Sequence, residues 1–214
     1  MWKTPILQEK ITEYSLLGND IVDLSHPDAT SIHSRFSERI CTDAEYEQLR
    51  GFPKKSQDWL IRLWTYWSIK EAAYKAVKGF DTGLKFRWKD FDTAAEPGKV
   101  HCPYDIELSV ETTPLFTCSC LHTIVYNSNI LRTSIHAQVD VISSDKYNVS
   151  DEIRQLFVSN IHEKFNFNYD QVNWNRHKSG APICSVNKKD LPFDISFSHH
   201  GRYMGYVLVV AGSK

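Results

Sequence analysis

Three side chains of this sequence have the types and spacing that phosphate chemistry needs. Asp20 follows the small-residue turn Gly18-Asn19, and Glu71 and Lys75 are four residues apart. Residues at that spacing share one face of a helix. A pair of carboxylates can hold a hard divalent cation, and a lysine can neutralise phosphate oxygens as a point charge. The simpler alternative for Glu71 and Lys75 is a solvated ion pair on a helix surface.

A long helix over residues 57–78 is predicted to carry Glu71 and Lys75. Its apolar residues recur three and four positions apart, which predicts one buried stripe. They are Leu60, Leu63, Trp64, Trp67, Ile69, Ala72, Ala73, Ala76 and Val77. Gly79 lies where a helix commonly ends. Upstream, Thr42-Asp43-Ala44-Glu45 is a capping box, which predicts a short helix from there to about Arg50.

Alternation of apolar and polar residues predicts a series of short strands around this helix. They cover 16–22, 84–89, 105–110, 115–126, 130–142, 172–174, 194–198 and 203–210. Asp20 would lie at the edge of the first strand. We expect 115–126 and 130–142 to form a hairpin around 127–129. A second helix is predicted over 150–165, so the pattern indicates an α+β protein with antiparallel sheets.

Composition and charge place the chain among ordinary globular proteins. It has 214 residues, of which 42% are hydrophobic and 24% charged, and its net charge is −1. No global field draws it to nucleic acid or to a membrane, so we expect neither as a partner. Between Arg50 and Lys89, however, bases outnumber acids. That excess would suit an acidic partner or a phosphorylated ligand, and a solvated surface explains it equally well.

The five cysteines indicate free thiols in a reducing compartment. The first residues carry no apolar run of signal-peptide length, and no stretch is apolar enough to span a bilayer. We therefore expect a cytoplasmic protein. Cys118, Cys120 and His122 alternate and would share one face of a strand, which could make a zinc site. Burial of cysteine as a small apolar residue is the favoured explanation.

Three motifs together resemble the signatures of the 4′-phosphopantetheinyl transferase superfamily. They are Gly18-Asn19-Asp20, the helical run Trp67-Ser68-Ile69-Lys70-Glu71 with Lys75 four residues on, and Ser196-Phe197-Ser198-His199. The resemblance implies an enzyme of the holo-[acyl-carrier-protein] synthase kind. It would transfer the 4′-phosphopantetheine arm of coenzyme A to a serine of an apo acyl carrier protein or peptidyl carrier domain, in fatty acid or secondary metabolite biosynthesis. The other product would be adenosine 3′,5′-bisphosphate.

The resemblance also assigns roles to residues. Asp20 and Glu71 would hold Mg²⁺, or Mn²⁺, and Glu71 would act as general base. Lys75, as a second catalytic group, would reach the phosphates of coenzyme A. The residues implied in binding coenzyme A are Lys70, Lys75, Lys178, Gly180, Pro182, Ser198 and His199.

The order of the motifs implies two similar lobes, each a long helix packed on a small antiparallel sheet, with their usual order swapped. Residues 1–148 would form the lobe with the first two motifs, and residues 149–214 the lobe with the serine-histidine segment. The best linker is 143–149. One chain could then form the cleft between the lobes alone, so we expect a monomer.

Two departures from the family pattern leave alternatives open. Ala181 stands where the family has a lysine, and Lys178 or Arg176 could replace that amine. Val22 stands where two-lobed members have a third acid, and Asp23 is expected to point away from Asp20, because side chains alternate along a strand. The rival functions are another Mg²⁺-dependent phosphoryl or nucleotidyl transferase, and a non-catalytic module that binds coenzyme A or a carrier.

Overall fold

The computed structural model describes residues 15–210 apart from 34, 118, 143–147, 166 and 168. The helices are α2 (Pro27–Thr30), α3 (Phe36–Ile40), α4 (Asp43–Leu49), α5 (Gln57–Phe80) and α6 (Val149–Phe165), with short 3₁₀ turns η1 (Trp88–Asp90), η2 (Pro103–Asp105), η3 (Arg132–Ser134) and η4 (Tyr169–Gln171). The strands are β1 (Leu17–Asp23), β2 (Lys99–Cys102), β3 (Ile106–Leu115), β4 (Cys120–Tyr126), β5 (His136–Val141), β6 (Val172–Arg176), β7 (Pro182–Val186), β8 (Lys189–Asp190), β9 (Phe193–His200) and β10 (Tyr203–Val210). Neither α5 nor any other helix in the described part of the chain has the length and hydropathy to cross a bilayer.

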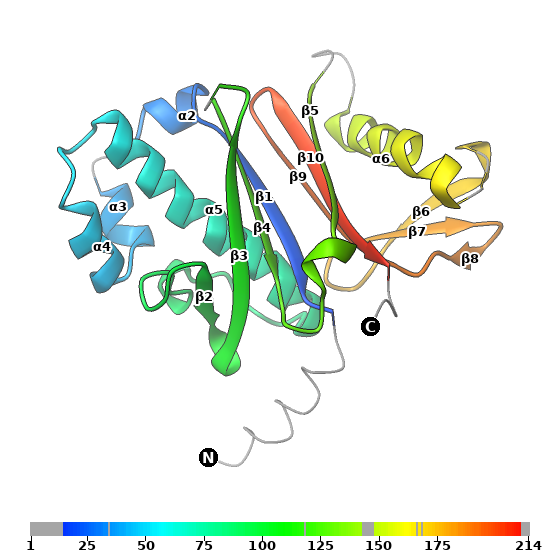
Figure 1. Ribbon diagram of the computed structural model, residues 1–214, viewed down its shortest axis with the longest axis horizontal. Coiled ribbons are helices and arrows are strands. Elements are labelled where there is room, and N and C mark those ends of the chain that lie inside the picture. The colour runs from blue at the N-terminus through cyan, green and yellow to red at the C-terminus, as the bar shows by residue number, and fades with distance from the viewer. Residues whose placement is uncertain are drawn as a thin grey trace.

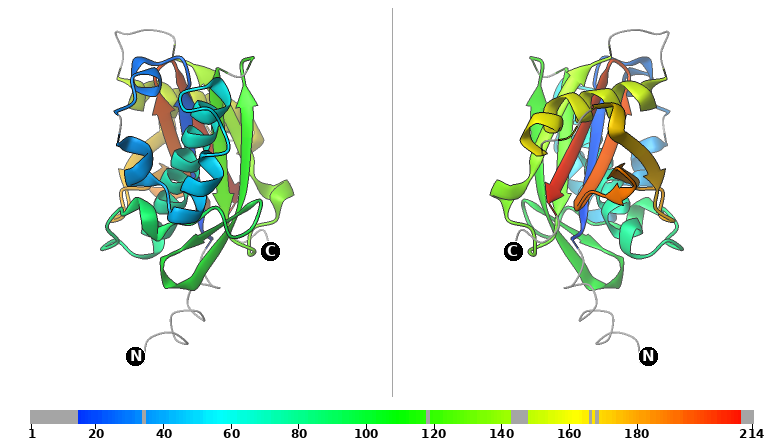
Figure 2. Two further views of the ribbon diagram at one scale, coloured as in Figure 1. Left: turned by 90° about the vertical axis from the view of Figure 1, so that its left-hand side faces the viewer. Right: turned by 90° about the vertical axis from the view of Figure 1, so that its right-hand side faces the viewer.

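The strands form three antiparallel sheets, so the predicted α+β class is confirmed. Their orders are β1-β4-β3-β2, β5-β10-β9 and β6-β7-β8. In Figure 1 the strands of the first two sheets lie together between α5 and α6. Figure 2 shows the same arrangement from either side, with α5 in front in one view and α6 with β6–β8 in front in the other.

Side chains, rather than a backbone ladder, join the first two sheets. Strand β1 has β4 on one side, and on its other side β9 runs alongside it. Three alternate backbone N–H groups of β1 donate to side chains of β9: Asn19 to Ser196 Oγ at 3.2 Å, Ile21 to Ser198 Oγ at 3.1 Å and Asp23 to His200 Nδ1 at 3.0 Å. Since these donors would otherwise be unpaired at a sheet edge, the bonds fix where β9 lies against β1.

The long helix α5 packs directly on β1. Most of its predicted apolar stripe is buried, and Ala72, Ala73 and Val77 have no exposed surface. A Cβ atom built on Gly18 would lie 2.1 Å from the carbonyl oxygen of Ala72. Only glycine therefore allows helix and strand to approach this closely, which explains the first residue of the Gly18-Asn19-Asp20 motif.

Other helix predictions are confirmed, with ends shifted by a few residues. Thr42 caps α4 and makes both bonds of the predicted capping box with Glu45. The helix predicted over 150–165 is α6, which buries Phe157 against β10 and its neighbours. Helix α5 continues one residue past Gly79.

Two strand predictions are wrong. Residues 84–87 form no strand and lead into η1. Phe86 from this segment instead stacks on Tyr74 of α5, with ring centroids 4.6 Å apart. Its apolar alternation therefore reflects packing on a helix.

The predicted hairpin of 115–126 with 130–142 is also wrong. The chain already reverses at Phe116 and Thr117, whose φ angles are 49° and 55°, so that β3 and β4 are the paired strands. Strand β5 crosses to the second sheet and pairs with β10. The ranges 1–148 and 149–214 thus share a sheet, and their division into two similar lobes stays a prediction. Residues 143–147 of the predicted linker lie outside the described residues.

Candidate active site

One cavity brings together the three side chains that the motifs single out. Its volume is 390 Å³, and it is lined by Asp20 of β1, by Glu71 and Lys75 of α5 and by residues of β9. Strand alternation turns Asp20 toward α5, on the same face as Gly18. Because α5 lies so close to β1 at Gly18, the two elements bring their functional side chains to the same space.

Lys75 links the helix to the strand. Its ammonium donates to the backbone oxygen of Asn19 at 2.9 Å, to Asp20 Oδ1 at 3.1 Å and to Ser198 Oγ at 3.3 Å. Its side chain is still 31% exposed. The ammonium is therefore held in place and remains accessible from the cavity.

Glu71 is a half-buried carboxylate without a hydrogen bond or ion pair among the described residues. Burial raises its pKa to about 7, the Asp20 carboxylate adds to the rise, and Lys75 opposes it. A buried carboxylate whose charge is disfavoured by a second carboxylate in the same cavity is typical of a functional site rather than a structural pair.

The donor set fits a hard divalent cation. Asp20 Oδ1 accepts from Lys75 and Ser198, and no hydrogen bond among the described residues engages Oδ2. Glu71 contributes a second carboxylate to the same cavity. Mg²⁺ is commonly held by one or two carboxylates plus phosphate oxygens, and Mn²⁺ takes similar ligands. Asp20 and Glu71 are thus the residues that would hold such an ion.

A larger cavity adjoins the first and is rich in basic side chains. Its volume is 570 Å³, and it shares Lys75, Phe197 and His199 with the smaller cavity. Its basic and histidine lining residues are Lys75, Lys78, Arg154, Arg176, His177 and His199, and Asp194 also lines it. An elongated anionic ligand could therefore occupy the larger cavity and reach the carboxylates through the region around Lys75.

Four of the residues predicted to bind coenzyme A line these cavities besides Lys75. Gly180 and Pro182 line the larger one, Ser198 the smaller one, and His199 both. Lys178 is exposed on the turn between β6 and β7 and is absent from the lining. Of the two candidates for the amine missing at Ala181, Arg176 is the one that faces the cavity.

Lys70 corrects the sequence prediction, because it cannot reach a ligand in either cavity. Its side chain has no exposed surface, and its ammonium lies 2.6 Å from Glu45 Oε2. It also donates to the backbone oxygens of Ile40 at 2.8 Å and Trp88 at 3.0 Å. These contacts use all three N–H groups, so Lys70 ties α5 to the preceding helices and η1.

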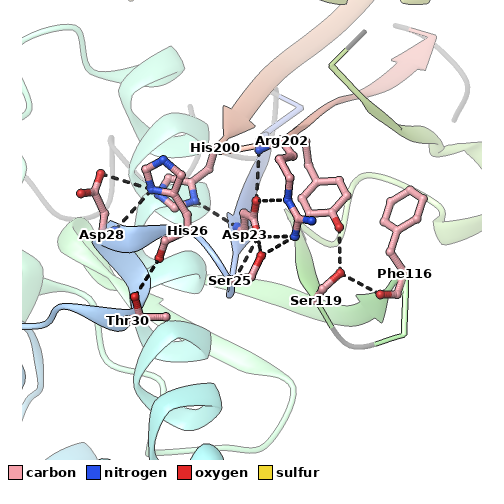
Figure 3. Close-up of polar contacts among 10 residues, drawn as sticks. Asp23, Ser25, His26, Asp28, Thr30, Phe116, Ser119, His200 and Arg202 are labelled. Carbon is pink, nitrogen blue, oxygen red and sulfur yellow. Dashed lines mark hydrogen bonds and ion pairs between the residues drawn. The ribbon is translucent and has the colours of Figure 1, made fainter. Parts of the chain in front are cut away.

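Asp23 points away from the cavity, as predicted. Figure 3 shows its carboxylate facing Arg202, which donates from Nε to Oδ2 at 2.9 Å and from its terminal nitrogen to Oδ1 at 3.0 Å. Ser25 donates from its hydroxyl to Oδ1 at 2.6 Å. Burial alone would raise the pKa of Asp23, but the bonds from Arg202 and Ser25 lower it well below its usual range. Asp23 is a structural anchor.

Two other groups of metal-type side chains have features that disfavour a metal. Figure 3 shows His26, Asp28 and His200 together. His200 Nδ1 accepts the N–H of Asp23, so its neutral ring carries the proton on Nε2 and has no lone pair there for a metal. In the predicted zinc alternative, Cys118 lies outside the described residues. Burial raises the pKa of Cys120 to about 12, which disfavours the thiolate that zinc needs.

Arg154 and the two tryptophans Trp64 and Trp67 also line the cavities, which the sequence patterns did not predict. Arg154 lies on α6, with its guanidinium 5.9 Å from the centre of the Trp174 ring. Helical spacing from buried Ile153 and Phe157 could have placed it at the edge of the apolar stripe. The tryptophans were assigned to the buried stripe, although Trp67 is only partly buried.

Comparisons with known proteins find similarity to one family. The family model of the 4′-phosphopantetheinyl transferase superfamily matches residues 16–130, more than half of the 214 residues. A holo-[acyl-carrier-protein] synthase of Bartonella bacilliformis is 34% identical over 85 residues, which are 38% of this chain; the chain thus spans 59% of that curated relative. A crystal structure of Thermotoga maritima holo-[acyl-carrier-protein] synthase aligns with 69% of this chain and 93% of that one, at 12% identity and a TM-score of 0.37, which is too low to compare the folds.

Proposed function

Because the chain belongs to the 4′-phosphopantetheinyl transferase superfamily, we propose that it transfers the 4′-phosphopantetheine arm of coenzyme A to a serine of an apo carrier protein. The observation that carries this proposal is the meeting of Asp20, Glu71 and Lys75 in one cavity beside a larger basic one. The chain matches its curated relative over only part of that relative's length, so the substrate and partner are proposals as well.

The two cavities suit the two ends of coenzyme A. The nucleotide end carries most of the negative charge, and the larger cavity supplies Arg154, Arg176 and Lys78. The pyrophosphate would lie near Lys75 and His199, which line both cavities. A ligand placed this way brings the phosphorus that is attacked to the carboxylates of the smaller cavity.

The side chains of this protein then divide the work. Glu71 takes the proton of the carrier serine, whose oxygen forms a bond to the phosphorus of the pantetheine phosphate. The bond from that phosphorus to the bridging oxygen breaks, and adenosine 3′,5′-bisphosphate leaves. Lys75 stabilises the negative charge that develops on the phosphate oxygens. In the metal-free site, burial and Asp20 raise the pKa of Glu71 to about 7, and a cation bound there would favour the ionised carboxylate that accepts the proton.

Asp20 and Glu71 would hold Mg²⁺ or Mn²⁺. When bound, the ion supplies Lewis-acid stabilisation of the phosphate oxygens. Lys75 also holds Asp20 Oδ1 at 3.1 Å, so the orientation of this carboxylate is fixed before any ligand binds.

The direct test is to incubate the protein with coenzyme A, Mg²⁺ and a panel of apo acyl and peptidyl carriers, and to measure the carrier masses. We expect one carrier class to gain the mass of one phosphopantetheine arm, with release of adenosine 3′,5′-bisphosphate. Glu71→Gln keeps the shape of the side chain and removes its charge, so it should abolish the gain. No gain on any carrier, with coenzyme A still bound, would favour a non-catalytic binding module.

A further inference from the structure

We infer that Ser198 is a positioning residue for the Asp20 carboxylate rather than a contact of coenzyme A, so that β9 sets the cation affinity of a site built on β1 and α5. The inference rests on the proposed function in one respect, namely that Asp20 is a cation ligand. It differs from what the serine-histidine motif implied, which was a direct contact between Ser198 and coenzyme A.

The hydroxyl of Ser198 has no bonding capacity left for a ligand. It accepts the N–H of Ile21 at 3.1 Å and the ammonium of Lys75 at 3.3 Å. It donates to Asp20 Oδ1 at 3.2 Å. A serine hydroxyl has one donor and two acceptor sites, and these three bonds use all of them. Its residue is only 5% exposed, so water competes little for the same bonds.

These bonds orient the carboxylate. Ser198 and Lys75 both act on Oδ1, from β9 and from α5. Oδ2 of Asp20 is engaged by no hydrogen bond among the described residues, and Asp20 lines the cavity together with Glu71. One oxygen is therefore anchored while the other stays available to a cation. Partners that orient a ligand in this way typically change metal affinity when they are removed.

Ser196 provides a matched control two residues earlier on the same strand. It is 7% exposed and accepts the N–H of Asn19 at 3.2 Å, just as Ser198 accepts the N–H of Ile21. Among the described residues its hydroxyl makes no hydrogen bond to Asp20 or Lys75. Ser196→Ala therefore removes one bond between β1 and β9. Ser198→Ala removes an equivalent bond together with the bonds to the Asp20 carboxylate and the Lys75 ammonium.

The experiment is a titration with Mn²⁺ alone, followed by electron paramagnetic resonance of the free ion, on the full chain and its variants. Ser198→Ala should weaken Mn²⁺ binding roughly 10- to 100-fold. Ser196→Ala should leave it unchanged, and Ser198→Thr, which keeps a hydroxyl, should restore it. Calorimetry without metal should show that the wild type and Ser198→Ala bind coenzyme A with the same affinity. The melting temperatures of both alanine variants measure the effect of the hydrogen bond between β1 and β9 that each variant loses.

The outcomes distinguish a failure of the role inferred for Ser198 from a failure of the proposed function. Equal Mn²⁺ affinities of the two alanine variants, with binding by the wild type intact, would overturn the role of Ser198 and leave the proposed function standing. Loss of coenzyme A affinity in Ser198→Ala without loss of Mn²⁺ affinity would overturn it too, in favour of a direct contact. If the wild type and Glu71→Gln bound no Mn²⁺ at all, the cation site of the proposed function would fail and the inference with it.

Discussion

Helix α5 carries two lysines that each pair with a carboxylate from another element, and the two pairs differ in almost every physical respect. Lys70 and Glu45 lie 2.6 Å apart, and both side chains are 0% exposed. Lys75 and Asp20 lie 3.1 Å apart, with exposures of 31% and 10%. The first pair is sealed inside the protein, and the second opens to the cavities.

The sealed pair has every hydrogen bond that its groups can use. Besides Lys70, the Glu45 carboxylate accepts the backbone N–H of Thr42 at 2.9 Å and both the N–H and the hydroxyl of Thr93, each at 2.9 Å. Burial lowers the pKa of Lys70, although Glu45 opposes that shift. A buried charge is tolerated only when it is paired and hydrogen-bonded in this way. The pair fixes α4, α5 and η1 against one another.

The open pair is incomplete by comparison. Asp20 has one oxygen without a partner among the described residues, and the neighbouring Glu71 raises the local negative charge rather than balancing it. The difference between the two pairs shows that one helical motif has both a structural and a functional lysine. Lys70 holds the helix in the fold. Glu71 and Lys75 face a cavity that suits a divalent cation together with an anionic ligand.

The largest effect expected from this comparison is on stability. Lys70→Met leaves Glu45 buried without its cation, which should lower the free energy of unfolding by roughly 3–5 kcal/mol. Urea unfolding followed by circular dichroism measures it. The double variant Glu45→Gln/Lys70→Met removes both charges and should recover part of the loss. A stable, inactive Lys70→Met would mean that Lys70 acts in the chemistry after all.

Lys75→Met should show the opposite pattern. Removing one preorganised cation from the site should lower kcat roughly 10²- to 10³-fold. The stability should change by no more than about 1 kcal/mol, because the pair is partly exposed and screened. Rates on whichever carrier of the proposed panel is modified, and urea unfolding of the same preparation, give both values. Equal losses of melting temperature and activity would make Lys75 a structural residue like Lys70.

A smaller, pH-dependent effect belongs to His122, which is buried on β4. Burial lowers its pKa to about 4, and the nearby charge of Lys75 adds to the shift. The unfolded chain takes up this proton near pH 6.5, so His122 contributes its full stability above that pH and loses it as the pH falls to about 4. The loss should be roughly 3 kcal/mol.

Urea unfolding at several pH values, for wild type and His122→Gln, isolates this contribution from the other titrating groups. The variant should lose less stability than the wild type between pH 6.5 and 4. Parallel curves for the two proteins would mean that His122 is protonated as easily when folded as when unfolded.

The sequence predicted much of this molecule where a pattern is local. Spacing along α5 predicted its buried stripe and the shared face of Glu71 and Lys75, and the capping box predicted α4. Alternation along β1 predicted that Asp20 and Asp23 point to opposite faces. Each of these properties depends on residues within a few positions of one another.

Several properties that depend on distant residues were not predicted, although the family resemblance implied that Asp20 and Glu71 share one site. Nothing in the helical pattern distinguishes Lys70 from Lys75, because the partner that seals Lys70 is Glu45, on another helix. The serine-histidine motif suggested ligand contacts, but Ser198 meets a strand edge that comes from the opposite end of the chain. The alternation over 84–89 favoured a strand because half-buried packing on a helix leaves the same pattern.

The most direct test is a crystal structure of the protein with coenzyme A and Mn²⁺, with data collected where manganese scatters anomalously. We expect one strong anomalous peak within roughly 2 Å of an oxygen of both Asp20 and Glu71, next to the pyrophosphate and Lys75. A peak elsewhere, for example at His26 and Asp28, or Asp20 and Glu71 turned to separate sites, would contradict this expectation.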